Sequence, residues 1–131
     1  MTLLVPNEGE VKTLQLLLAS NLTFKLFSND IVPAETNTAA SYTEVVGGGY
    51  IAKILLGGSW TIHEGAPSYG IYAAQDYNFT GVTNAPGTIY GYFIVDAEGI
   101  CRWAERFNAA VLPFSPINGS LIRIIPRFEA S

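Results

Sequence analysis

The chain has 131 residues, which suits a single domain that buries about two-thirds of its unfolded surface. Its charged fraction of 14% is well below the roughly 25% of ordinary globular proteins, and its net charge of −4 argues against nonspecific nucleic-acid binding. The single cysteine, Cys101, excludes an internal disulfide and a multi-cysteine metal site. Because so few charges leave little polar surface, we expect partner proteins to cover much of this domain.

The N-terminal region predicts the one good helix of the chain, over residues 8–19. Asn7 is placed to cap it, and Glu10 stands where a capping box carries its acid. Leucines at helical spacing predict burial of more than a narrow stripe: Leu14, Leu16, Leu17 and Leu18. The chain start lacks the pattern of a signal peptide and no apolar run is long enough to span a membrane. We therefore expect folding in a cytoplasm and no membrane partner.

Short strands separated by turns are predicted for the remainder. Along residues 22–29, Leu22, Phe24 and Leu26 share one face. Residues 50–56 fit a strand or a helix, and the three glycines before them predict a hinge or bulge. Pro126 places the last strand, or its end, at a sheet edge. Further strands are expected at 42–46, 60–63, 71–80 and 121–128, with a loop at 31–41, a turn at 82–86 and an irregular segment at 108–119.

The most informative stretch is residues 87–107, in which two β-rich runs flank a hairpin turn at 96–99. The first run is apolar on both faces, which predicts a central strand or one that lies under a partner. In the second run, strict alternation places four side chains on one face: Cys101, Trp103, Glu105 and Phe107.

These elements predict a mainly β fold, an antiparallel, jelly-roll-like β-sandwich with one short N-terminal helix, as a single domain over residues 1–131. The helix is expected to pack on one end of the sandwich. The side chains expected in the core are Phe24, Leu26, Trp60, Ile89, Phe93, Trp103 and Phe107.

The residues that carry chemistry form no recognisable catalytic, cofactor or metal motif. His63 is the only histidine, and no Gly-x-Ser-x-Gly elbow accompanies it. Cys101 lacks a Cys/His signature, and residues 47–49 lack the Gly-Lys-Ser/Thr ending of a phosphate loop. We therefore expect a protein that is not an enzyme, with no cofactor, no metal and no catalytic residue.

The arginines all lie in the last third of the chain, as two pairs with a spacing of four: Arg102 and Arg106, then Arg123 and Arg127. Along a strand this spacing places both members of a pair on one face. If the two strands are neighbours in one sheet, the four guanidinium groups form a basic patch suited to an acidic partner. The alternative is a solvated outer face whose arginines are balanced by acids, and both remain open.

Several segments of the chain resemble small virion structural proteins of tailed bacteriophages. The likeness lies in residues 4–10, 22–30, 42–44, 48–50, 87–93 and 104–107, and so extends over most of the sequence. The resemblance implies a β-sandwich decoration (cement) protein that binds the lattice of the major capsid protein. It also implies a homo-oligomer, with a trimer favoured, located in the virion after synthesis in the host cytoplasm.

Two alternatives stay open beside the cement protein. One is a head–tail connector, or a tail- or fibre-associated component; the other is a carbohydrate-binding β-sandwich module that holds a sugar on Trp60 and exposed tyrosines. The residues that we expect at the partner interface are Arg102, Arg106, Arg123, Arg127, Tyr90 and Tyr92.

Overall fold

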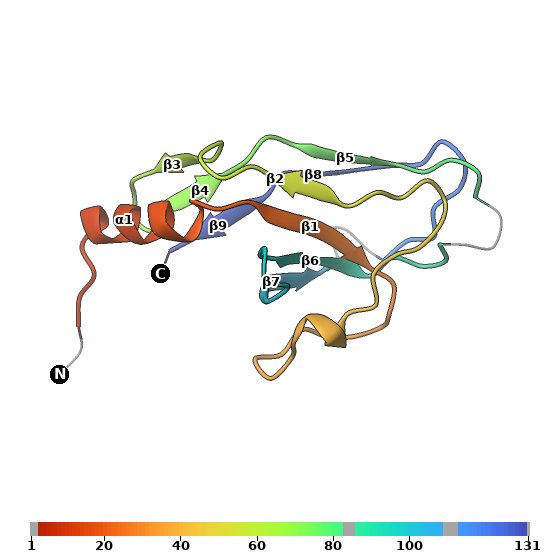
Figure 1. The fold of residues 1–131 in the computed structure, drawn as a ribbon, viewed down its shortest axis with the longest axis horizontal. Helices are drawn as coiled ribbons and strands as arrows, with labels where there is room; N and C mark the ends of the chain where they lie inside the picture. The colour runs from red at the N-terminus through yellow and green to blue at the C-terminus, as the bar shows by residue number, and fades with distance from the viewer. Residues whose placement is uncertain (1–2, 83–85, 109–112, 131) are drawn as a thin grey trace.

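The computed structural model describes residues 3–82, 86–108 and 113–130, and within them the chain is mainly β, with antiparallel sheets and one short helix (Figure 1). Residues 83–85 of the predicted turn and residues 109–112 of the predicted irregular segment lie outside this part. The elements are α1 (Asn7–Leu17), β1 (Leu22–Phe27), the 3-10 turn η1 (Ala39–Ser41), β2 (Lys53–Leu55), β3 (Thr61–His63), β4 (Tyr69–Ile71), β5 (Gln75–Asn78), β6 (Gly91–Val95), β7 (Cys101–Arg106), β8 (Leu121–Ile124) and β9 (Arg127–Glu129).

The main sheet has four strands in the order β2-β1-β6-β7. Its centre is β1, where Phe24 lies opposite Lys53 of β2 on one side and Ile94 of β6 on the other. Leu22, Phe24 and Leu26 are fully buried on one face, as the alternation predicted. Within residues 50–56, which the sequence left undecided, Lys53–Leu55 form the short edge strand β2.

The predicted hairpin is confirmed as β6 and β7, joined through a turn at Asp96. The register shifts between Ile94, which pairs with Trp103, and Val95, which pairs with Cys101. Arg102 is therefore an extra residue in a β-bulge, and the strict alternation predicted for β7 is wrong. Cys101 consequently packs with the second cluster described below, whereas Trp103 packs against the main core.

The second face of β6 is covered by the chain itself. Phe93 and Val95 are buried in a small cluster with Phe27 and with Tyr42, whose ring stacks on Phe93 at a centroid distance of 5.2 Å. Tyr42 is carried by the loop at 31–41 and its η1 turn, which packs across the sheet. β6 is thus a central strand, and a partner is not needed to bury its second face.

The other two sheets form one kinked antiparallel ribbon. The order β3-β4-β9 makes one sheet and β5-β8 the other, and the Tyr72 N–H, which donates to the Pro126 carbonyl at 2.9 Å, links them. The prediction of continuous strands at 71–80 and 121–128 is therefore wrong, because both strands are interrupted beside the Tyr72–Pro126 hydrogen bond. The edge position predicted from Pro126 is confirmed, since β8 and β9 are both end strands.

Helix α1 packs on β3 and β4, at one end of the ribbon (Figure 1). Leu14 is buried, whereas Leu16 is 67% exposed, so the predicted broad apolar face is wrong. The predicted cap is also wrong, because Pro6 occupies the N-cap, Asn7 is already helical and no side chain caps the end. At the other end of the helix Leu18 comes so close to β4 that a Cβ on Gly70 would lie 2.5 Å from its Cδ1.

Three consecutive glycines turn the chain from the loop back toward the main sheet. Gly47, Gly48 and Gly49 all have positive φ, between 63° and 89°, which confirms the predicted hinge. The hinge delivers Tyr50, whose hydroxyl accepts the Leu26 N–H at 3.1 Å and donates to Glu44 Oε2 at 2.9 Å. The predicted strand at 42–46 is reduced to a single bridge between Phe27 and Glu44.

The main core lies between the main sheet and the ribbon. Tyr77 of β5 reaches across it, donating a hydrogen bond to the Phe24 carbonyl at 2.8 Å. Trp103 is only partly buried and stacks on Phe128 of β9. The other predicted core side chains are buried, as expected: Phe24, Leu26, Trp60, Ile89, Phe93 and Phe107.

Candidate interaction surface

The four arginines lie on strands of three different sheets. Arg102 and Arg106 belong to β7, Arg123 to β8 and Arg127 to β9. β7 and β8 are not neighbours in one sheet, so the condition for a single basic patch is not met. The bulge also removes Arg102 from the alternation that Arg106 follows. The other interpretation, guanidinium groups balanced by acids, fits the contacts of all four.

Arg102 closes the hairpin turn. Its Nε donates to Asp96 Oδ2 at 2.8 Å, while Asp96 Oδ1 accepts the N–H groups of Ile100 and Glu98. The Arg102 guanidinium, with these two amides, holds the pKa of the Asp96 carboxyl below its ordinary value. Arg102 thus stabilises the turn, although 41% of its side chain stays accessible to a partner.

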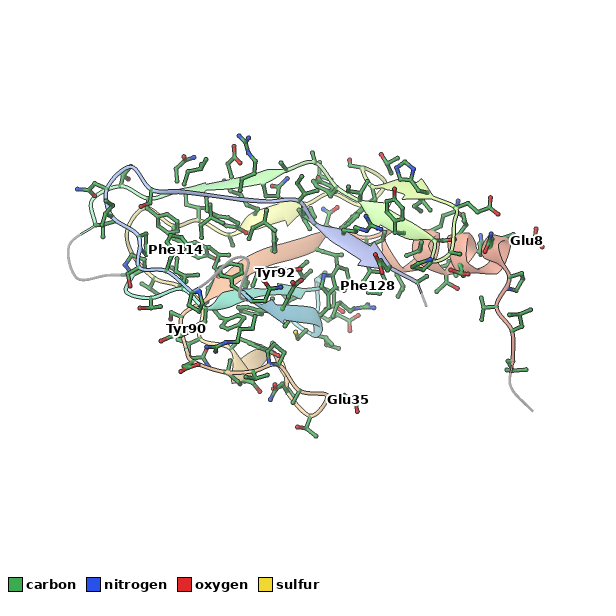
Figure 2. All side chains as sticks on the ribbon, turned by 180° about the vertical axis from the view of Figure 1, so that it is seen from behind. Glu8, Glu35, Tyr90, Tyr92, Phe114 and Phe128 are labelled. Carbon is green, nitrogen blue, oxygen red and sulfur yellow. The ribbon has the colours of Figure 1, made fainter. Side chains whose placement is uncertain are left out.

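Arg106 ties the loop at 31–41 to β7. Its Nη1 lies 2.5 Å from Asp30 Oδ1 and donates to the Ile31 carbonyl at 3.3 Å. The same guanidinium lies 5.0 Å from the centroid of Tyr90, which Figure 2 labels beside this loop. The two predicted interface residues therefore contact each other, and the ring is partly covered by the arginine.

Arg123 and Arg127 are neutralised within the kinked ribbon. Arg123 forms a bidentate pair with Asp76, directly opposite on β5, at 2.7 and 3.0 Å. This hydrogen bonding lowers the pKa of Asp76 and raises that of Arg123. Arg127 lies 3.8 Å from the centroid of Tyr69 and pairs with Glu129 at 3.0 Å.

Tyr92 is anchored at the border of the main core. Its hydroxyl donates to Glu105 Oε2 at 2.7 Å and its ring meets Phe24 edge-on at 4.9 Å. Burial raises the pKa of the Tyr92 phenol, so it stays protonated. Tyr92 and Arg123 line one shallow cavity of about 270 Å³. They are, after Arg106 and Tyr90, the second pair of predicted interface residues that the fold brings together.

His63 and Cys101, the base and nucleophile candidates, lie on strands of different sheets. His63 is exposed on β3, where its ring stacks on Tyr69 at 4.8 Å. Cys101 is half-buried, and burial raises the pKa of its thiol, which disfavours the reactive thiolate. Among the described residues, no group of three or more His, Cys, Asp or Glu side chains is placed to hold a metal ion.

Trp60 lies at the main core's border, beside the end of α1. Its side chain is only 8% exposed and packs edge-on against Tyr72, so it offers no open platform for a sugar ring. Its buried Nε1 has no hydrogen-bond partner among the described residues. The indole also lines an open cavity of about 480 Å³, together with Gln15, Leu18 and Gly57–Gly58.

Sequence reasoning missed two exposed apolar segments. The N-terminal arm, residues 3–6, carries Leu3, Leu4 and Val5 with exposed fractions of 85%, 90% and 54%. The β2 rim, which we define as Ile51, Ile54 and Leu56, is 72%, 60% and 51% exposed. Both were visible as apolar runs, but which apolar residues stay in water depends on what the fold places over them. The two segments carry six of the thirteen large apolar side chains that are exposed among the described residues.

Comparisons with protein-family models, with curated proteins and with solved structures found no match. Among the described residues, no helix has the length and apolar character needed to cross a membrane. The functional argument therefore depends on the surface of the molecule itself.

Proposed function

We propose that this chain is a non-enzymatic structural protein of a tailed-phage virion, a cement protein that binds the major capsid protein lattice and stabilises the capsid. The observation that carries the proposal is the apolar surface. Among the described residues, thirteen large apolar side chains are exposed, and the charged fraction of the sequence is only 14%. Surfaces of this kind are typical of proteins that neighbours cover in an assembly.

The proposed assembly is a homo-oligomer, with a trimer favoured, and the jelly-roll-like sandwich remains part of this proposal. The contacts among the described residues change the physical reason for expecting an oligomer. The second face of β6 is buried by Tyr42 within the chain, so it gives no reason for association. The exposed arm and β2 rim give that reason instead, since a symmetric oligomer would remove them from water.

The proposed capsid contact uses Arg102, Arg106, Arg123, Arg127, Tyr90 and Tyr92. Charge reversal with Arg102→Glu and Arg123→Glu would also place a carboxylate beside Asp96 and Asp76. The double variant Arg102→Gln, Arg123→Gln avoids that repulsion. We expect it to stay folded but to bind capsids less tightly, most clearly at low salt. Equal capsid binding by this variant and the unchanged chain would contradict the arginine contact.

The test of the proposed function is the copy number in purified particles of the phage that encodes the chain, measured by quantitative mass spectrometry. Hundreds of copies per particle are the expected result for a cement protein. Six or twelve copies would favour a neck or tail component. Absence from the particle, combined with glycan binding by the isolated protein, would favour the carbohydrate-binding module instead.

A further inference from the structure

The N-terminal arm is an extended apolar segment that its own chain leaves in water. It runs away from the sheets at the start of α1, where Figure 2 labels Glu8 (Figures 1 and 2). A cavity of about 510 Å³ separates the arm from Leu17 of α1 and Phe128 of β9. The arm therefore has apolar side chains to bury, and Leu3, Leu4 and Val5 belong to no helix or strand; Pro6 has no N–H, and its carbonyl accepts the Glu10 N–H.

The β2 edge offers a complementary surface. β2 is an end strand of the main sheet, so one row of its backbone N–H and C=O groups points away from β1. Among the described residues, Leu56, which directly follows β2, is closed on that side: its N–H donates to the Tyr72 hydroxyl at 2.9 Å and its carbonyl accepts the Ser59 N–H at 3.2 Å. Ile51 and Ile54 of the β2 rim lie beside the unclosed part. An added extended segment would bury them and complete the ladder.

The charges next to the two segments are of opposite sign. Glu8 follows the arm and is exposed, whereas Lys53 lies within β2. Among the described residues, Lys25 and all four arginines form ion pairs with carboxylates, but Lys12 and Lys53 form none. The Lys53 ammonium lies 5.7 Å from the Tyr77 ring centroid, and its charge helps to lower the pKa of Asp76, so a carboxylate from outside would add to this interaction.

The arm of the same copy cannot reach this edge. β2 ends at Leu55, and two residues later the Gly57 N–H donates to Asn21 Oδ1, just beyond the C-terminal end of α1. The arm leaves from the opposite end of the helix, and eleven helical residues span about 16 Å. Fully extended, residues 3–6 cover at most about 14 Å, so Leu3, Leu4 and Val5 of the same copy stop short of β2.

We propose that the N-terminal arm of one copy adds to the β2 edge of a second copy, as a fifth strand of its main sheet. Alternate arm side chains then lie beside Ile54 on one face and beside Lys53 on the other. The inference rests on the oligomer in the proposed function and names the contact that builds it. It does not depend on what the oligomer binds.

The first experiment compares molecular mass in solution, by light scattering after gel filtration, for the full-length chain and its variants. We expect the unchanged protein to be an oligomer. Leu3→Asp with Leu4→Asp, and separately Ile51→Asp, should each reduce the mass to that of a single chain. Ile51 precedes β2, so its substitution spares the pairing with β1. Ile117→Asp, at an equally exposed residue outside both segments, is the matched control and should leave the mass unchanged.

The second experiment mixes the two monomeric variants. The arm variant keeps an intact β2 rim and the Ile51→Asp variant keeps an intact arm, so together they should form a 1:1 complex that neither forms alone. A chain that carries both sets of changes should join neither. Only an arm-to-edge contact predicts this complementation, and circular dichroism of each variant checks that its sheets are folded.

Three outcomes would overturn the inference: an unchanged chain that is monomeric, an arm variant that keeps the full oligomeric mass, or folded variants that fail to complement. An arm variant that keeps the full oligomeric mass would not count against the proposed capsid binding, because the copy number in particles tests that function separately. Conversely, a protein absent from particles but dissociated by these substitutions would refute the cement function and retain the arm contact.

Discussion

Gly91 is the residue at which the main sheet leaves no room for a side chain. A Cβ there would lie 2.2 Å from the Glu105 carbonyl and 2.6 Å from Phe27 Cζ. Both neighbours are held by pairing or burial. We expect Gly91→Ala to lower the free energy of unfolding by about 3 kcal/mol, as overpacked core sites do. Urea unfolding measures the change.

Gly9→Ala is the matched control for this substitution. Gly9 is helical, and the nearest atom to an added Cβ is a Val5 methyl at 3.3 Å, at the flexible end of an exposed side chain. Alanine is the better helix former, so stability should rise by up to about 1 kcal/mol. Equal effects at the two glycines would show that the Gly91 contact is not the cause.

Asp76 and Asp96 make stability depend on pH in the acid range. Hydrogen bonds from Arg123 and Arg102 lower the pKa of these carboxyls in the folded state. Their contribution is therefore complete above the unfolded value of about 4 and is lost as the pH falls through the folded pKa. In Asp76→Asn, Asp96→Asn, the free energy of unfolding should fall less steeply between about pH 4 and pH 2. A slope equal to that of the unchanged protein would contradict this assignment.

The loop at 31–41 acts as the second layer over the main sheet. Tyr42 is its anchor, with its ring 5.2 Å from both Phe93 and Phe27. Tyr42→Ala should cost about 3 kcal/mol and increase binding of a dye that recognises apolar surface, because Phe93 becomes exposed. Tyr42→Phe keeps the ring and should change little. A loss of stability without added dye binding would mean that the loop is not the cover.

How far the sequence predicts these elements depends on whether the deciding contact is local. The β6–β7 hairpin, β1 and the glycine hinge follow from alternation and turn residues within a few positions. The bulge at Arg102 and the break opposite Pro126 depend on how two strands align, which a single strand's pattern does not encode. The arginine patch failed for the same reason, since strand order decides which residues are neighbours. Leu16 shows the limit for helices: propensity places it in α1, but packing decides its exposure.

At the scale of the whole molecule, the arginines and the exposed apolar segments differ in whether their own chain supplies a partner. All four arginines are already paired within the chain, whereas the arm and the β2 rim are open. Association through these segments should therefore weaken only slightly with NaCl between about 50 and 500 mM, as salt screens the attraction between Glu8 and Lys53, and sulfate should strengthen it. Light scattering at each salt concentration measures this, and dissociation at high NaCl would indicate that ion pairs hold the oligomer.

The pairing of β1 with β6 also predicts the order in which the strands form during folding. Phe24 and Ile94 are about 70 residues apart, whereas the β6–β7 hairpin closes within a few. Pairing of distant strands loses more loop-closure entropy before stabilising contacts form. The hairpin should therefore form first, and β1 should pair with β6 late in folding. Ile94→Val should then slow refolding, while Leu22→Ala in β1 should mainly accelerate unfolding. Stopped-flow kinetics in urea resolve the two limbs, and a larger effect of Leu22→Ala on refolding would reverse the order.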